Sequence, residues 1–96
     1  MYGTIARMQA KPGMQDKLLE FMRRADARTV PGYKTTYVYR MDTDPSTYMI
    51  AVVFESREAY VANANSPEQD AEYRELLTML QAPPEWHDGE IIYPTA

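Results

Sequence analysis

The sequence predicts an α+β fold in which one antiparallel sheet of four strands carries two helices on a single face. Stretches rich in β-branched and aromatic residues alternate with two stretches of helical periodicity. The stretch Tyr48-Met49-Ile50-Ala51-Val52-Val53-Phe54 is apolar on both alternating faces, so both sides of this strand need a cover. Right-handed crossovers place both helices on the same side of the sheet. The opposite side is therefore left for a partner subunit.

The first half of the chain reads as a strand followed by a helix. Tyr2 to Ala10 form the strand, and Lys11-Pro12-Gly13 interrupts it. From Met14 to Arg28 apolar residues recur at helical spacing, with charged residues on the opposite side. Pro31-Gly32 then ends the helix. The apolar stripe consists of Met14, Leu18, Phe21, Met22 and Ala25.

A hairpin occupies the centre of the chain. Tyr33 to Met41 form the second strand, and Asp42-Thr43-Asp44-Pro45-Ser46 is turn material that joins it to the third strand. Because the connection is short, the two strands are antiparallel.

The second half begins with two helix caps. Ser56 is suited to cap a short helix that contains Tyr60, and Ser66-Pro67-Glu68-Gln69 is a stronger start signal. We expect this second helix to run to about Gln81. Its inward side carries Tyr73, Leu76, Leu77 and Leu80. A last strand from Trp86 to Tyr93 completes the order βαββαβ, which is a ferredoxin-like unit.

Length, charge and composition narrow the function classes. The 96 residues form a single domain, residues 1–96. A net charge of −4 and a pI near 4.9 argue against nucleic acid as a partner. No apolar run approaches the ~18 residues of a membrane span, so no membrane partner is expected. The chain has no cysteine, which is compatible with a reducing compartment, and a cytoplasmic location is the expectation.

The inventory of reactive side chains is small. The chain has one histidine, His87, and Asp42 and Asp44 are placed as turn residues, so no metal site is expected. The four glycines are scattered and do not form a phosphate-binding loop. The serines fall where turns and caps need them, without a neighbouring base. We therefore expect no cofactor and no nucleophilic triad.

Tyrosine and methionine are the notable residue types. Several tyrosines around one cavity would suit a flat, partly polar ligand, and methionines would make its wall adaptable. Tyr60 and Tyr73 follow the third strand and are placed to point towards the sheet, as cavity residues or as packing residues. The alternative for the strand tyrosines is a dimer interface, and the methionines, Met22 among them, can equally fill the core. The strand tyrosines are Tyr33, Tyr37, Tyr39 and Tyr48.

Nearly the whole chain resembles the antibiotic biosynthesis monooxygenase family. The likeness rests on the order of elements, on Lys11-Pro12-Gly13, on Pro31-Gly32-Tyr33, and on Phe54-Glu55-Ser56-Arg57-Glu58-Ala59-Tyr60 followed by Ser66-Pro67. The resemblance implies a homodimer with the dimeric α/β-barrel fold. Members of that family include cofactor-free oxygenases of anthrone-like or quinol substrates, haem-degrading enzymes, and proteins without known activity.

The resemblance also implies site residues. Tyr60 matches the tyrosine that closes a Trp-Glu-x-x-x-Ala-Tyr pattern of the cofactor-free oxygenases. Arg74 matches the arginine of an Ala-Glu-Leu-Arg-Glu run, here Ala71-Glu72-Tyr73-Arg74-Glu75. Phe54 stands at the pattern's tryptophan, and Ile50 stands where those enzymes have an asparagine. The expected catalytic residues are Tyr60 and Arg74, and the expected substrate-binding residues are Tyr73, Phe54, Ile50, Asn63 and Met22. The haem-degrading branch fits poorly, because the position of its axial histidine falls on Tyr73.

Two functions follow as expectations. The first is a cofactor-independent monooxygenase that oxidises a small aromatic phenol, quinol or polyketide-like substrate with molecular oxygen. In that reading Tyr60 hydrogen-bonds the substrate oxygen and Arg74 offsets its developing negative charge. The alternative for Arg74 is an ordinary ion pair on the helix surface, for example with Asp70. The second function is a non-catalytic homodimeric module that binds a hydrophobic aromatic metabolite, and a purely structural dimer is a third possibility.

Overall fold

The computed structural model describes residues 1–26 and 29–93. Its elements follow the order βαββααβ. They are β1 (Tyr2–Gln9), α1 (Gln15–Asp26), β2 (Tyr33–Arg40), β3 (Thr47–Phe54), α2 (Arg57–Ala64), α3 (Pro67–Leu77) and β4 (Glu85–Glu90). All four predicted strands and the predicted hairpin are confirmed.

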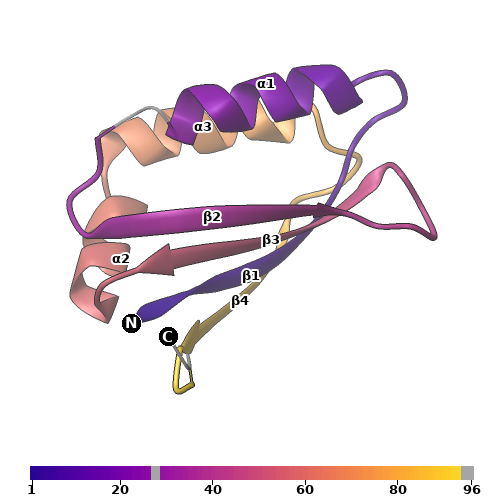
Figure 1. Ribbon diagram of the computed structural model, residues 1–96. Helices are drawn as coiled ribbons and strands as arrows, with labels where there is room; N and C mark the ends of the chain where they lie inside the picture. Colours follow the sequence, from indigo (N-terminus) through magenta and orange to yellow (C-terminus); the bar gives the residue numbers. More distant parts are fainter. Residues whose placement is uncertain (27–28, 94–96) are drawn as a thin grey trace.

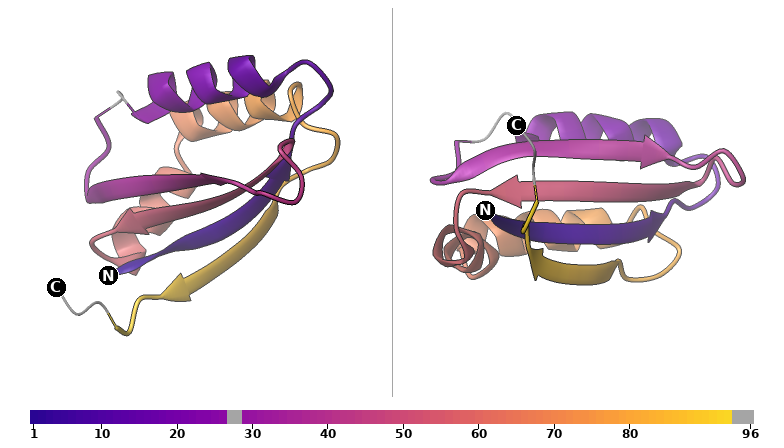
Figure 2. Two further views of the ribbon diagram at one scale, coloured as in Figure 1. Left: turned by 45° about the vertical axis from the view of Figure 1, so that its right-hand side comes forward. Right: turned by 60° about the horizontal axis from the view of Figure 1, so that its bottom comes forward.

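The sheet is antiparallel with strand order β2-β3-β1-β4. Helices α1 and α3 lie side by side over one face of this sheet, as predicted (Figures 1 and 2). Helix α2 lies at one end of the sheet, beside the start of β1 (Figure 1). The result is a two-layer α+β arrangement that confirms the ferredoxin-like fold class.

The helical segment after β3 differs from the prediction. Ser56 caps α2 by accepting a hydrogen bond from the Ala59 N–H, 3.1 Å away, and the expected short helix extends over eight residues. The predicted second helix, α3, ends at Leu77 and not near Gln81. Beyond it the backbone turns back towards β1, because the Gln81 N–H donates to the Gln9 carbonyl and Leu80 forms an isolated bridge with Ala10. Long-range strand pairing therefore ends the helix before its sequence pattern does.

The end of the last strand also differs from the prediction. The last strand begins at Glu85 and ends at Glu90, so the predicted strand to Tyr93 is three residues too long. The predicted end of the first helix at Arg28 lies outside the described residues.

The turn interpretation of Asp44 is confirmed, because its carboxylate accepts hydrogen bonds from Ser46 and Thr47. Hydrogen bonds from the Ser46 side chain and backbone lower the pKa of Asp44.

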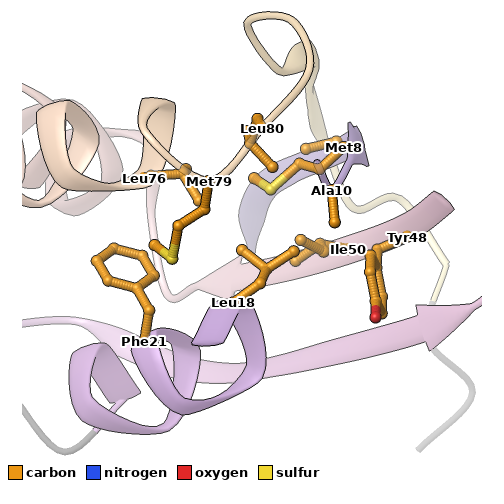
Figure 3. Close-up of a cluster of buried hydrophobic side chains, with 10 residues drawn as sticks. Met8, Ala10, Leu18, Phe21, Tyr48, Ile50, Leu76, Met79 and Leu80 are labelled. Carbon is orange, nitrogen blue, oxygen red and sulfur yellow. The ribbon is translucent and has the colours of Figure 1, made fainter. Parts of the chain in front are cut away.

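The core lies between the sheet and the pair α1 and α3. Figure 3 shows side chains from both helices meeting strand residues across this layer. Leu18 of α1 is completely buried, and Leu76 of α3 is nearly so. Tyr48 is completely buried on the same side, opposite Met8 on β1. The expectation that Tyr48 belongs to a dimer interface is therefore wrong: the alternation of β3 turns this ring into the core.

The other face of the sheet carries an exposed apolar centre. Ile5, Ala51 and Tyr37 lie opposite one another on β1, β3 and β2. Ile5 is 53% exposed and Tyr37 is 58% exposed. Tyr39, which pairs with Met49, is 60% exposed. We call this the open face, and it is the side that the sequence leaves for a partner.

Candidate functional site

A cavity of about 680 Å³ lies between the sheet, the three helices and the segment before β2. Its volume falls within the range of small-molecule sites in proteins. Most of its lining side chains are apolar or aromatic. Those from the helices include Leu19, Phe21, Met22, Tyr60, Ala64, Tyr73 and Leu76, and those from the strands include Met8, Tyr33, Val38, Ile50, Val52, Phe54 and Trp86.

Tyr60 reaches the cavity from the first turn of α2. The Ser56 cap fixes the start of this helix, and the Tyr60 N–H donates to the Ser56 carbonyl oxygen at 3.2 Å. Its ring lies between two other aromatic rings, with centroids 5.3 Å from Tyr2 and 5.5 Å from Phe54. Such tilted and edge-on contacts hold the ring in place. The phenol is thus positioned by local helix geometry and by two strands.

The Tyr60 hydroxyl donates a hydrogen bond to Asp88 Oδ1 on β4 at 2.7 Å. Burial raises the pKa of Tyr60 to about 12, and the hydrogen bond to Asp88 adds to the rise. The nearby Thr4 hydroxyl acts in the opposite direction. The phenol is therefore neutral at physiological pH and keeps its proton available as a hydrogen-bond donor.

Thr4 supplies a second hydroxyl to the same end of the cavity. Thr4 and Asp88 are cross-strand partners on β1 and β4, so their side chains leave the sheet on the same face. Thr4 is only 5% exposed, and its Oγ1 meets hydrogen-bond geometry with no group in the described part of the chain. Thr4 lies near enough to the Tyr60 hydroxyl to lower the pKa of that phenol by hydrogen bonding, although the contact falls outside the geometry of a full hydrogen bond. We call Thr4, Tyr60 and Asp88 the polar corner.

An aromatic pair adjoins the polar corner. Trp86 lies two residues before Asp88 on β4 and therefore on the same side of the strand. Its ring centroid is 6.4 Å from that of Tyr73 on α3, and both residues line the cavity. The far wall contains Met8, Met22 and Ile50, which offer no strong hydrogen-bonding group. The cavity thus combines one polar end, an aromatic side and an apolar remainder.

Six of the seven predicted site residues line this one cavity. They are Tyr60, Tyr73, Phe54, Ile50, Asn63 and Met22. Arg74 does not: its side chain is 78% exposed and pairs with Asp70 at 3.0 Å, which is the alternative that the sequence offered. The reason is rotational, because Tyr73 and Leu76 occupy the inner side of α3 and a residue one step from Tyr73 points elsewhere.

Three residues of the site were not predicted as such: Thr4, Trp86 and Asp88. Trp86 and Asp88 alternate on a predicted strand, so a shared face was foreseeable. The register between the first and last strands decides which face of the sheet Trp86 and Asp88 occupy. The same register places Thr4 opposite Asp88. No local pattern in the sequence specifies that register.

Four charged residues line the cavity, and three of them are exposed to solvent. Asp70 and Glu72 of α3 and Asp88 of β4 are acidic, and Arg23 of α1 is basic. Across the described residues no group of three or more metal-ligating side chains comes together. Within residues 1–26 and 29–93, every helix is too short or too polar to cross a membrane.

A sequence profile of the antibiotic biosynthesis monooxygenase family matches residues 1–75. The chain belongs to this family. The match covers the whole segment from β1 into α3, including Tyr60 and most of the cavity's helical wall. The family resemblance inferred from the sequence is thereby confirmed.

Solved structures show the same fold for this monooxygenase-family protein. A Chloroflexus aurantiacus protein named for the same family is 25% identical, with a TM-score of 0.81 over 99% of this chain and 96% of its own. A Caulobacter crescentus protein, also named for the family, is 14% identical, with a TM-score of 0.84 over 96% and 90% of the two chains. A Nitrosomonas europaea protein described as of unknown function is 23% identical, with a TM-score of 0.80 over 99% and 92%. Among curated proteins, the search finds no significant match.

Proposed function

We propose that this protein is a cofactor-independent monooxygenase that oxidises a small aromatic phenol, quinol or polyketide-like substrate with molecular oxygen. The observation that carries the proposal is the cavity of about 680 Å³, whose apolar and aromatic walls end in the polar corner. This shape and polarity fit a flat molecule that has an oxygen atom at one end. Membership of the family supports the reaction class.

The chemistry needs a substrate anion and a site that excludes water. Loss of a hydroxyl proton makes the aromatic substrate electron-rich, and an activated carbon of the anion then forms a bond to molecular oxygen. The substrate supplies the two electrons that reduce oxygen to the peroxide level. Loss of the hydrogen on that carbon as a proton breaks the O–O bond and leaves a carbonyl group, and the departing hydroxide takes up a proton to become water. The net change removes one hydrogen from the hydroxyl group and one from the carbon, adds one oxygen atom to that carbon, and produces one water molecule.

The residues of the cavity would contribute binding and electrostatics to this reaction. Tyr60 hydrogen-bonds the substrate oxygen, and Thr4 supplies a donor that the chain itself leaves unused. Tyr73 and Trp86 offer aromatic faces for the ring system. Arg74 has no part in this scheme within its own chain, because its guanidinium is exposed and paired with Asp70.

We further propose that the protein acts as a cytoplasmic homodimer joined through the open face. The row Ile5, Ala51 and Tyr37 presents an apolar strip that one helical layer leaves uncovered. Burial of such a strip against a second copy would cover both faces of β3, as its sequence requires. The absence of cysteine suits a reducing compartment.

A non-catalytic binding module is the second candidate, and two residues favour it. Ile50 and Phe54 line the cavity where the oxygenase pattern has polar or indole side chains. The cavity wall on β3 therefore offers mainly carbon surface to a ligand. Such a wall suits retention of a hydrophobic metabolite as well as its oxidation.

Oxygen uptake separates the two candidates. Protein treated with a chelator is mixed with a panel of anthrones, quinols and polycyclic phenols, and heat-denatured protein corrects for autoxidation. We expect uptake above this control, and we expect Tyr60→Phe to lower kcat/KM about tenfold or more. Tyr93→Phe removes the same atom from an exposed ring and serves as the matched control. Ligand-induced thermal stabilisation without uptake would instead support the binding module.

A further inference from the structure

The hydrogen bond from Tyr60 to Asp88 determines which groups of the polar corner can donate to a ligand and which can accept. The Tyr60 hydroxyl donates its only proton in a hydrogen bond to Asp88 Oδ1, at 2.7 Å. A phenol oxygen has one proton to donate and two lone pairs that accept. Because the proton is already donated to Asp88, Tyr60 can only accept a hydrogen bond from a ligand in the cavity. A ligand oxygen that approaches Tyr60 in this state must bring a proton of its own.

Asp88 is placed to keep Tyr60 in this orientation. Within the described chain the Asp88 carboxylate accepts a side-chain hydrogen bond from Tyr60, and it lies on the edge strand β4, where it is open to solvent. Tyr60 is more enclosed, among the rings of Tyr2 and Phe54. Both residues line the cavity, and Asp88 is the more exposed of the two.

Thr4 offers the complementary group. Its buried hydroxyl has no partner in the described chain and lines the same cavity. A buried hydroxyl without a partner costs free energy, and a ligand oxygen would remove that cost. Since Thr4 stands opposite Asp88 across the strands, a ligand oxygen in the polar corner can accept from Thr4 while it donates to Tyr60.

We propose that the polar corner selects a neutral aromatic ligand with a free hydroxyl group, and that Tyr60 and Asp88 form a relay for that hydroxyl's proton. The ligand hydroxyl donates to Tyr60 Oη, and Tyr60 donates to Asp88. In the reaction, the ligand proton moves to Tyr60 as the Tyr60 proton moves to the Asp88 carboxylate. Tyr60 ends neutral, Asp88 becomes a carboxylic acid that returns its proton to water, and the ligand becomes the anion.

This relay avoids an unfavourable intermediate. A tyrosinate at Tyr60 is disfavoured, because burial and the neighbouring carboxylate raise the pKa of this phenol to about 12. In a coupled transfer Tyr60 never carries a negative charge. The reaction step rests on the proposed monooxygenase function, whereas the ligand preference does not.

The test compares hydroxyarenes with their methyl ethers, which have the same ring system but no proton to donate. Suitable pairs are 1-naphthol with 1-methoxynaphthalene, 4-phenylphenol with 4-methoxybiphenyl, and 2-hydroxyanthraquinone with its 2-methoxy analogue. Dissociation constants are measured without oxygen. For wild-type protein we expect the hydroxyl form to bind about tenfold more tightly than the ether in at least one pair.

Substitutions at Asp88, Tyr60 and Thr4 test which of these groups produces the preference for the hydroxyl form. Asp88→Ala removes the acceptor of the Tyr60 proton, which frees Tyr60 to donate into the cavity, so the preference should fall to about twofold or less. Tyr60→Phe should remove it as well. Thr4→Val should weaken the hydroxyl and ether forms equally, because both oxygens accept from Thr4. The matched controls are Asp42→Ala, Tyr93→Phe and Thr43→Val, all on exposed residues, and all should keep the wild-type preference.

Each outcome of these binding and oxygen-uptake measurements decides a specific part of the proposal. Equal binding of hydroxyl and ether by wild-type protein, or a preference retained in Asp88→Ala, would overturn the relay. Absence of binding for every pair would overturn it too. A preference without oxygen uptake would refute the monooxygenase and leave the ligand selection standing. Where uptake occurs, Asp88→Asn should lower kcat far more than it changes KM, and the double variant with Tyr60→Phe should be no slower than the slower single variant.

Discussion

The titration of Tyr60 gives a direct physical test of the polar corner. Burial and the hydrogen bond to Asp88 raise the pKa of this phenol to about 12. At pH 11 an ordinary tyrosine is about 90% ionised, and Tyr60 should be only about 10% ionised. Asp88→Asn removes the acceptor carboxylate and its charge but leaves the ring enclosed. The pKa of Tyr60 should therefore fall below 12 and stay above 10.

The same shift predicts a dependence of stability on pH. The pKa of Tyr60 is higher in the folded chain than in the unfolded chain, so the neutral phenol stabilises the fold. This contribution is complete below about pH 10 and is lost as the pH rises through about 12. A shift of two units corresponds to at most about 2.7 kcal/mol, and the access of solvent to the phenol reduces this to about 1–2 kcal/mol.

Difference spectroscopy isolates this one tyrosine among eight. The absorbance of phenolate near 295 nm is recorded from pH 8 to 12.5 for wild type and for Tyr60→Phe, and the difference curve belongs to Tyr60. Unfolding free energies of both proteins are measured over the same range. Tyr93→Phe provides the reference for a solvent-exposed ring. A difference curve centred near pH 10, or one that Asp88→Asn leaves unmoved, would refute the coupling between the two groups.

Two further predictions concern the core and the open face. Leu18→Ala removes a completely buried side chain between α1 and the sheet. In urea unfolding at fixed protein concentration, we expect the free energy of unfolding to fall by about 2–5 kcal/mol. A decrease below about 1 kcal/mol would contradict the packing described above. Ala51→Arg places a charge at the centre of the open face, and light scattering should show a shift from dimer to monomer. Ala71→Arg, on the exposed side of α3, should leave the association unchanged. A wild-type monomer at micromolar concentration would refute the proposed dimer.

The local parts of the site could be predicted because they rest on short-range rules. Ser56 predicts the start of α2, and Tyr60 follows four residues later on its first turn. Tyr73 and Leu76 share the inner side of α3 through helical periodicity. For Arg74 the family resemblance implied a catalytic role and helical spacing offered an ion pair with Asp70, and the packing of α3 leaves the side chain exposed in that ion pair.

Sequence alone determined the kinds of element, their order and the need for a cover on both faces of β3. These features arise from backbone preferences and from alternation over a few residues, which are encoded locally. The tertiary structure decided where α3 ends and which side chains share the cavity. Gln81 pairs with Gln9, and Asp88 faces Thr4, across about eighty residues of chain. Such contacts depend on strand register and helix packing, and these are fixed only when the whole sheet and its helices come together.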